Sequence, residues 1–312
     1  MFLSQLKSRL HGRRISPAQL EEDSLIPSPF VVGVGRSGTT LLRLMLDAHP
    51  DLAIPPETHF IPAAAWAHRR ALNPRRAFLK TLTSHPMWND HGIDADLLSQ
   101  EISALKPFNL GEALRAFYRL YAGRHAKPRW GDKTPLYVRH MKLIQGLLPE
   151  ARFVHIIRDG RDVALSHRGL WFGPGSIEEA ARGWVLWIKE ARSQSRHLLH
   201  YLEIRYEDLV LDPEATLKRV SAFVALPWNP AMLEYHKTAE QRMKELHRDL
   251  QVQGGAKTIP AAGRQTIHSL TSKPPQHDRV YRWRSEIAET DRKHFESVAG
   301  EMLRELGYDV LS

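Results

Sequence analysis

The chain has 312 residues, of which 42% are apolar and 25% charged. This balance is typical of a globular protein that buries a large core, and it is unlike that of a disordered chain. The complete lack of cysteine excludes disulfides, iron–sulfur clusters, thiolate nucleophiles and zinc sites that need sulfur, while histidine–carboxylate metal sites stay open. Forty-four Lys and Arg against 35 Asp and Glu give a net charge of +9, which favours an anionic partner: nucleic acid, a membrane surface, another polyanion or a phosphorylated small molecule.

Residues 1–28 form an N-terminal extension ahead of the predicted globular domain, residues 29–312. Phe2, Leu6 and Leu10 fall at near-helical spacing among basic residues, as in helices that lie on a membrane surface. A short helix that packs on the body or frays in solvent shows the same pattern, and this is the commoner case. The extension lacks the continuous apolar core of a signal peptide, and no apolar run approaches the roughly 18 residues that span a bilayer, so we expect a cytoplasmic protein.

Short apolar runs alternate with longer helical patterns through most of the chain. Strands are predicted at residues 30–34, 129–131, 152–157 and 201–205, and helices follow them at residues 39–48, 135–147, 161–167 and 213–224. Repetition of this unit predicts an α/β fold: a P-loop-like parallel sheet flanked by helices.

Two segments depart from the alternation. Residues 61–127 have a helical pattern broken by proline pairs, which predicts a helical insertion that walls a cleft. Residues 247–280 carry Gly254, Gly255 and several prolines among polar residues, so we expect a long, mobile loop that closes over a ligand. Residues 284–306 are predicted to be helical, and with this loop they would form a C-terminal lid region.

The sharpest local pattern is PFVVGVGRSGTTLLRLML at residues 29–46, where a buried strand leads through a glycine turn into a helix. Such a turn presents successive backbone N–H groups to an anion, and the helix adds the positive end of its dipole, although structural glycines produce a partly similar pattern. Gly33 and Gly38 have the spacing of a Walker A loop, but Thr39 stands where that loop has its lysine. A phosphate site is therefore predicted, without the lysine that a nucleoside triphosphatase uses.

A second segment, RFVHIIRDGRDVALS at residues 152–166, places Arg158 at a strand end and Ser166 on the following helix. Arginine can fork onto a phosphate, and a serine hydroxyl adds a donor. GRSGTT at residues 35–40 resembles the 5'-phosphosulfate loop of sulfotransferases that use 3'-phosphoadenosine 5'-phosphosulfate (PAPS), and the second segment resembles the 3'-phosphate motif of that family. The two motifs in this order make the chain similar to a PAPS-dependent sulfotransferase.

The resemblance implies a donor site. The residues expected at the 5'-phosphosulfate are Arg36, Ser37, Gly38, Thr39 and Thr40, and those expected at the 3'-phosphate are Arg158 and Ser166. RVYRWRSEI at residues 279–287 loosely resembles a C-terminal family segment that closes over the nucleotide, so Arg282 or Arg284 is expected to contribute, with Ser269 a weaker candidate. YEDLVLDP at residues 206–213 recurs in such proteins, and we interpret it mainly as structural: a strand end, a turn and a helix start.

The resemblance also implies catalytic groups. Residues 36–58 are similar to the corresponding run of protein-tyrosine sulfotransferases and their bacterial relatives, in which Glu57 matches the base that takes the acceptor proton. His59 is a competing base, because other branches use histidine, and Glu57 could instead be a helix N-terminal glutamate stabilised by the dipole. Lys133, in WGDKTPLY, matches the lysine near the transferring sulfonate, where with Arg36 it would neutralise developing charge. The alternative is an exposed loop lysine paired with Asp132.

The sequence thus predicts transfer of a sulfonate from PAPS to an acceptor hydroxyl, with no metal. The acceptor stays open among a peptide tyrosine, a sugar, a lipid and a small phenol. A P-loop kinase is one alternative, opposed by Thr39 and by the lack of a clear Walker B pattern around Asp159. A non-enzymatic polyanion-binding protein is another, but the basic residues are scattered and match no nucleic-acid motif, so nucleic acid is not expected as a partner.

Overall fold

A computed structural model describes residues 26–170, 173–246, 248–252, 257–266 and 269–311. The helix predicted in the N-terminal extension falls on residues outside these ranges. Within the ranges, no helix combines the length and the apolar character that crossing a membrane requires.

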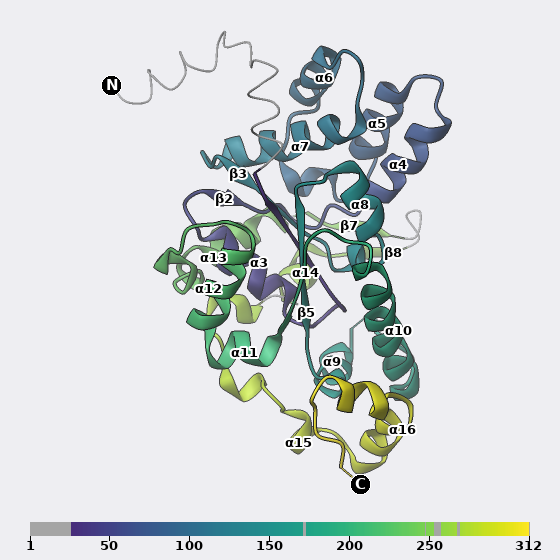
Figure 1. Cartoon of the computed structure of the whole chain (residues 1–312), viewed down its shortest axis with the longest axis vertical. Helices are drawn as coiled ribbons and strands as arrows, with labels where there is room; N and C mark the ends of the chain where they lie inside the picture. The colour runs from purple at the N-terminus through teal and green to yellow at the C-terminus, as the bar shows by residue number, and fades with distance from the viewer. Residues whose placement is uncertain (1–25, 171–172, 247, 253–256, 267–268, 312) are drawn as a thin grey trace.

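Four parallel strands form the central sheet in the order β4, β1, β5, β6 (Figure 1). Their bounds are β1 (Ser28–Val32), β4 (Asp132–Lys133), β5 (Ala151–Ile157) and β6 (Tyr201–Arg205). β1 is buried along its whole length, and Val31 pairs with Lys133 on one side and with Val154 on the other. Strands covered on both faces need the nearly continuous apolar runs that the sequence shows here. The predicted α/β fold with a parallel sheet is confirmed.

The strand predicted at residues 129–131 is divided between two sheets. β3 (Arg129–Trp130) pairs with the short β2 (Leu52–Ala53), and the chain then enters β4 of the central sheet. Gly131 lies between the two, and a Cβ there would come within 2.8 Å of the Pro29 carbonyl oxygen. A strand shift this tight is available only to glycine, so Lys133 reaches the central sheet directly beside β1.

Alternate side chains of the strands pack on different helices. Val31 and Val154 belong to a core with α3 (Thr39–Asp47), α11 (Tyr206–Leu211) and α12 (Pro213–Phe223). Phe30 and Phe153 belong to another core, with the insertion and α8 (Met141–Leu147). The helix predicted at residues 135–147 begins as a 3-10 helix, η2 (Pro135–Arg139), before α8. A third core joins three helices, α9 (Gly160–His167), α10 (Ile177–Ser195) and α16 (Glu289–Glu305).

The helical insertion lies at one end of the molecule and α16 at the other (Figure 1). The insertion comprises α4 (Ile61–Arg70), α5 (Pro74–Thr83), η1 (Trp88–His91), α6 (Ala95–Ala104) and α7 (Leu110–Arg124). Asn73, Asp94 and Asn109 accept backbone hydrogen bonds at the starts of α5, α6 and α7, which explains why these helices begin where they do. The prediction of a wholly helical pattern here agrees with the structure.

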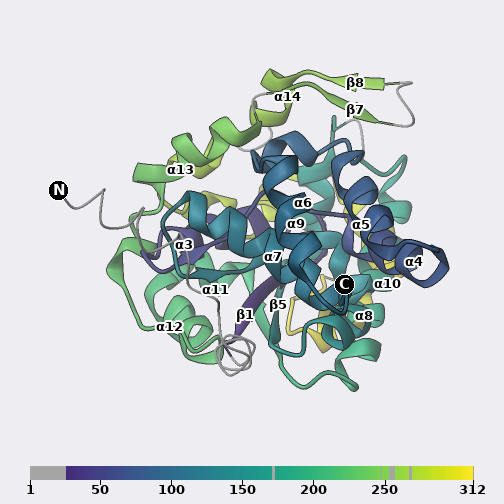
Figure 2. The same cartoon turned by 90° about the horizontal axis from the view of Figure 1, so that it is seen from above.

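The segment expected to be a long loop, residues 247–280, contains regular structure where it is described. β7 (Leu250–Val252) and β8 (Lys257–Ile259) form an antiparallel hairpin, followed by α14 (Ala261–Thr266), η6 (Ser269–Ser272) and η7 (His277–Arg279). Figure 2 shows the hairpin and α13 (His236–Met243) along one edge of the molecule, with α14 between them. The sequence pattern did not reveal this regular structure, because the strands are only three residues long and so give little periodic signal.

The remaining short helices are η3 (Pro230–Met232), η4 (Lys244–Leu246) and α15 (Trp283–Glu286).

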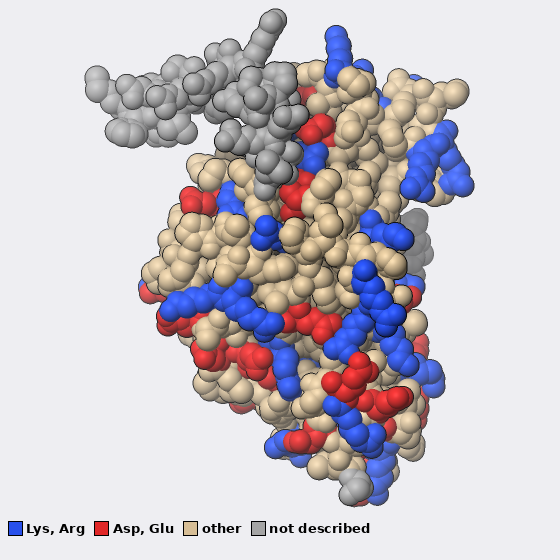
Figure 3. All heavy atoms as spheres, in the orientation of Figure 1, with Lys and Arg blue, Asp and Glu red and all other residues tan. Residues whose placement is uncertain are grey.

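On the face drawn in Figure 3, basic and acidic side chains are interspersed over the lower half, and a further group of basic side chains lies at the α4 end of the insertion. Arg69 and Arg70 end α4, and neither its first turn nor that of α5 carries an acidic residue.

Candidate active site

The predicted site residues meet at the carboxyl ends of the four strands. Arg36 follows β1, Lys133 ends β4, Arg158 follows β5 and Tyr206 follows β6. Ligands of open parallel sheets bind at this edge, where the strand order reverses. Here β1 has β4 on one side and β5 on the other, so the turn after β1 occupies that position.

Two cavities adjoin this turn, one of about 140 Å³ and one of about 410 Å³. Arg36, Thr39 and Thr40 line both of them. We call the smaller one the donor cavity, after the predicted donor residues that line it, and the larger one, which Glu57 lines, the acceptor cavity. A group held at these three residues would be reached from either side.

The turn after β1 takes conformations that its sequence explains. Gly38 has φ 94°, and a Cβ on it would meet the ring of Tyr206 at 2.4 Å. Arg36 also has positive φ, at 70°, an uncommon conformation for a residue with a side chain. α3 begins at Thr39 without a side-chain cap or an acidic first turn, so its first N–H groups and the positive end of its dipole face the cavities.

The donor cavity gathers residues from separate parts of the chain. Of the predicted donor residues, those lining it are Arg36, Gly38, Thr39, Thr40, Arg158, Ser166 and Arg282. Arg36 Nε donates to Ser166 Oγ at 3.2 Å, which brings the two sequence motifs together. Ser37 is buried beneath the turn and lines neither cavity. Ser269 starts η6, and its side chain lies outside the described part, whereas Thr271 of the same helix lines the cavity.

Other donor-cavity residues were missed by sequence reasoning. They include Tyr206, Tyr235, Gln276 and Arg279. The Arg158 guanidinium lies 4.3 Å from the Tyr206 ring, and its Nη2 donates to the Arg279 carbonyl at 2.7 Å. Tyr206 opens the YEDLVLDP segment, so our interpretation of that segment as mainly structural was incomplete. The sequence did contain a signal for Tyr206: it directly follows the predicted strand 201–205, and ligands bind at the carboxyl ends of parallel strands.

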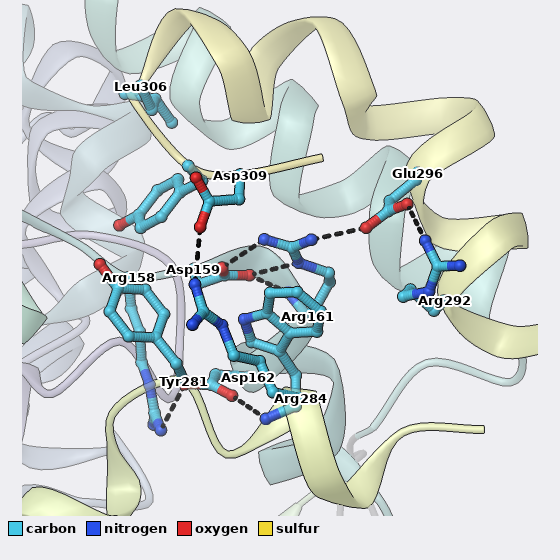
Figure 4. A network of polar contacts seen from close by, with 12 residues as sticks. Arg158, Asp159, Arg161, Asp162, Tyr281, Arg284, Arg292, Glu296, Leu306 and Asp309 are labelled. Carbon is cyan, nitrogen blue, oxygen red and sulfur yellow. Dashed lines mark hydrogen bonds and ion pairs between the residues drawn. The ribbon is translucent and has the colours of Figure 1, made fainter. Parts of the chain in front are cut away.

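The middle of the second motif anchors the C-terminal segment (Figure 4). Arg161 is fully buried, bonded to Asp159 at 2.7 Å and to Glu296 at 2.5 Å, with the Trp283 ring 3.5 Å away. Asp162 accepts the backbone N–H of Trp283 at 2.9 Å. These contacts fix α9 against α15 and α16, and thus hold Arg158 and Arg282 on the same cavity. Arg284 is exposed and pairs with Asp309 at 2.6 Å, away from the donor cavity.

Glu57 lies at the centre of the predicted catalytic group. Lys133 Nζ donates to Glu57 Oε1 at 2.5 Å, and His59 Nε2 lies 2.8 Å from Oε2. Lys133 Nζ also reaches Thr40 Oγ1 at 3.4 Å. Burial opposes ionisation of Glu57, but Lys133 and His59 together lower its pKa well below the usual range. Burial lowers the pKa of Lys133, and Glu57 partly offsets that effect.

The structure decides between readings left open for these residues. Lys133 is buried and paired with Glu57, so the alternative of an exposed lysine paired with Asp132 was wrong. α4 begins at Ile61, four residues after Glu57, so Glu57 is not in its first turn. His59 lines the acceptor cavity beside Glu57 and has positive φ, at 53°; such strained backbone clusters at functional sites.

A buried polar network positions Glu57 against Lys133. Thr58 donates its hydroxyl to Asp132 at 2.8 Å and its backbone N–H to Thr134 Oγ1 at 3.0 Å. Tyr118 also donates to Asp132, at 2.9 Å, and burial raises the pKa of Asp132 to about 6. Thr58 and Asp132 point into the core, so their chain neighbours Glu57 and Lys133 face the cavity on the same side.

The acceptor cavity has mainly apolar walls. Its aliphatic, aromatic and thioether lining residues are Pro56, Met87, Pro135, Leu136, Trp187, Met243, Leu246, Leu250 and Ile259. They come from the segment before the insertion, from the insertion itself, from η2, from α10, from α13 and η4, and from the β7–β8 hairpin. Among the described residues, no group of three His, Cys, Asp or Glu side chains is placed to hold a metal.

The comparison with known proteins completes this description. The model of the sulfotransferase family matches residues 27–230, which is more than half of the chain. The chain belongs to the sulfotransferase family. Protein-tyrosine sulfotransferase A of Caenorhabditis elegans is 29% identical over 91% of this chain and 67% of its own. Protein-tyrosine sulfotransferase 1 of Danio rerio is 27% identical over 99% of this chain and 79% of its own.

Solved structures support the fold of this sulfotransferase. The sulfotransferase domain of the curacin biosynthetic pathway superposes with a TM-score of 0.61 at 20% identity, covering 91% of this chain and 99% of that domain. The sulfotransferase domain of the Synechococcus PCC 7002 olefin synthase gives 0.57 at 22% identity, covering 91% and 96%. The predicted family and enzyme class are confirmed, and the family implies PAPS as co-substrate.

Proposed function

We propose that this sulfotransferase moves a sulfonate from PAPS, held in the donor cavity, to an acceptor hydroxyl in the acceptor cavity. The observation that carries the proposal is the junction: Arg36, Thr39 and Thr40 line both cavities, and the Glu57–Lys133 pair stands beside them. A sulfonate at the junction lies in line between a leaving phosphate and an incoming hydroxyl.

The donor cavity suits a nucleotide with phosphates at two ends. The start of α3 offers backbone N–H groups to the 5'-phosphosulfate. Arg158 and Arg282 line the other side, where guanidinium groups can form paired, charge-assisted hydrogen bonds with the 3'-phosphate. Burial, followed by the nearby charge of Arg158, lowers the pKa of Arg36. This mutual repulsion is relieved when an anion binds between the two cations.

The reaction breaks one bond to sulfur as it forms another. The acceptor oxygen attacks sulfur, the bond from sulfur to the 5'-phosphate oxygen breaks, and 3'-phosphoadenosine 5'-phosphate (PAP) leaves. The hydroxyl proton passes to the Glu57 carboxylate. Lys133 and Arg36 stabilise charge on the bridging oxygen, so fixed cations take the part that Mg²⁺ takes in kinases.

Lys133 links donor binding to the strength of the base. Without donor, Lys133 neutralises Glu57 and keeps its pKa low, which makes a weak base. A sulfonate at the junction competes for the same ammonium group. As Lys133 turns toward it, the pKa of Glu57 rises, and the carboxylate becomes a better proton acceptor when both substrates are present.

The test is ligand-dependent stability without divalent metal. PAP should stabilise the protein against heat in EDTA, and ATP should do much less, because the second phosphate group of PAP meets Arg158. At a hundredfold excess over the dissociation constant the gain is about 2.7 kcal/mol, which differential scanning fluorimetry detects. Equal stabilisation by Mg-ATP, or dependence on Mg²⁺, would support the kinase alternative instead.

A further inference from the structure

The acceptor cavity is built to exclude water from an apolar molecule. At about 410 Å³ it falls in the range of roughly 300–1,000 Å³ that small-molecule sites occupy. Trp187 and Leu136 line it from α10 and η2, and Met243 and Leu246 line it from α13 and η4. These side chains offer no strong hydrogen-bond partners, so hydroxyl groups placed against them would lose their hydration without replacement.

The β7–β8 hairpin covers this cavity with an apolar inner face. Leu250 pairs with Ile259 across the hairpin, and each is 5% exposed and lines the cavity. Gln251 and Thr258, the next pair along, are exposed. The alternation is that of a strand pair with one face on an apolar interior and one in water. The interior that Leu250 and Ile259 face is the acceptor cavity.

Arg43 and Arg264, two charged side chains that line the acceptor cavity, already form ion pairs with carboxylates. Both terminal guanidinium nitrogens of Arg264 donate to the Asp90 carboxylate, and Nη1 lies 3.1 Å from Asp90 Oδ1. Arg264 also donates to the Arg248 carbonyl. Arg43 donates to Glu245 at 3.0 Å and to the Ile54 carbonyl at 2.9 Å. Lys133 and Arg36 stand at the junction with the donor cavity. An acidic acceptor would therefore enter beside Glu57 without a cation of its own.

We propose that the acceptor is an uncharged alcohol with an apolar body, phenolic or aliphatic, whose hydroxyl lies at Glu57 and whose body lies between Trp187 and the hairpin. This inference rests on the proposed function, because it assigns the acceptor side of the same reaction. A tyrosine flanked by acidic residues, a sugar and an anionic phenol are disfavoured by the same walls. Burying an unpaired charge there is costly.

The first experiment compares two ligands of the same ring system, one neutral and one anionic. Methyl 6-hydroxy-2-naphthoate and 6-hydroxy-2-naphthoate share a ring and a hydroxyl, but only the second carries a carboxylate. Their dissociation constants are measured by calorimetry on the full chain saturated with PAP. We expect the ester to bind at least tenfold more tightly. Equal affinity, tighter binding of the acid, or no binding of either would overturn the inference.

The second experiment moves a charge from the outer to the inner face of the hairpin. Ile259→Glu places a carboxylate in the cavity, and Thr258→Glu, the matched control, places it in solvent on the same strand. We expect Ile259→Glu to weaken binding of the ester at least tenfold with unchanged PAP affinity, and Thr258→Glu to change neither. If both variants bind the ester like the parent, the hairpin does not cover the acceptor.

The third experiment compares the turnover of a phenolic and an aliphatic alcohol with that of the disfavoured acceptors. PAP formation from PAPS is followed with 2-naphthol, 1-octanol, glucose and an acidic tyrosyl peptide. A kcat/KM at least tenfold higher for either apolar alcohol supports the inference and says which body fits, and preference for the peptide or the sugar overturns it. If PAP does not bind at all, the proposed function itself is wrong. The calorimetric titration with PAP measures this without any acceptor.

Discussion

In the donor cavity, the guanidinium groups of Arg36, Arg158, Arg279 and Arg282 line one hollow, whereas around the acceptor cavity Arg43 and Arg264 are each matched to a carboxylate. Arg158 and Arg282 also pair with Asp162 and Glu286, but burial and neighbouring arginines lower the pKa of Arg36 and of Arg282. The pKa of Arg43, in contrast, is raised despite burial, because of Glu245, so positive charge is less fully compensated on the donor side. Excess charge marks the place of a charged ligand, and balanced charge marks the place of an uncharged one.

The largest effect should come from the group between the two cavities. Glu57→Gln keeps the size of the side chain but removes its ability to accept a proton, so kcat should fall by roughly 10² to 10⁴ with little change in PAP affinity. The pKa of Glu57 lies below its usual range despite burial, because of Lys133 and His59. When a bound sulfonate draws Lys133 away, this pKa rises toward the ordinary glutamate value of about 4.3, and the carboxylate is still ionised above pH 5. The kcat measured by PAP release should therefore stay flat from pH 7 down to about pH 5.

Two controls accompany that variant. Glu190→Gln alters a half-buried glutamate that pairs with Arg139 and should leave kcat unchanged. His59→Asn should reduce kcat less than Glu57→Gln does. A histidine base with an ordinary pKa would lose activity as pH falls through about 6.5. Such a profile, together with an inactive His59→Asn and an active Glu57→Gln, would assign the base to His59.

A smaller effect is expected on the charged side. Arg158→Ala removes a charge-assisted contact to the 3'-phosphate and should weaken PAP binding by about 2 kcal/mol, or roughly 30-fold. Discrimination between PAP and adenosine 5'-phosphate should shrink by the same factor, as titration calorimetry would show. Arg284→Ala is the matched control, because Arg284 pairs with Asp309 away from the cavity. Unchanged discrimination in Arg158→Ala would mean that another residue binds the 3'-phosphate.

The smallest effect concerns the wall of the donor cavity. The Tyr235 hydroxyl donates to the Lys273 carbonyl at 2.6 Å, next to Pro274, Pro275 and Gln276 of the cavity lining. Tyr235→Phe removes one hydrogen bond and should weaken PAP binding by about 1 kcal/mol. The acceptor KM at saturating PAPS should not change. Full PAP affinity in this variant would show that the wall keeps its position without the bond.

Much of the lining of the donor cavity was predictable from sequence, because short motifs contain it. Arg36, Thr39 and Thr40 lie within five residues, and Arg158 and Ser166 within nine, each at a strand-to-helix turn whose physics is local. Arg279 was missed because it reaches the cavity only through the packing of the C-terminal segment on α9. Ser37 was included because of its place in the motif, although its side chain is buried away from both cavities.

The acceptor side could not be predicted in this way. Met87, Trp187, Met243 and Ile259 are far apart in the sequence, and each looks like an ordinary apolar residue in its own segment. Their common surface exists only after the insertion and the hairpin fold onto the sheet. One signal was available: Gly254 and Gly255 stand between two short runs with apolar residues, a pattern that indicates a hairpin as readily as a loop.

A single stretch of chain, from the β7–β8 hairpin through η7, contributes Leu250 and Ile259 to one cavity and Gln276 and Arg279 to the other. The Arg264–Asp90 pair fastens this stretch to the insertion midway. The proposed nucleotide and acceptor sites therefore share a structural element. Any free energy by which a nucleotide tightened that element would also appear in the affinity for the acceptor, and by thermodynamic linkage the acceptor would return the same factor to the nucleotide.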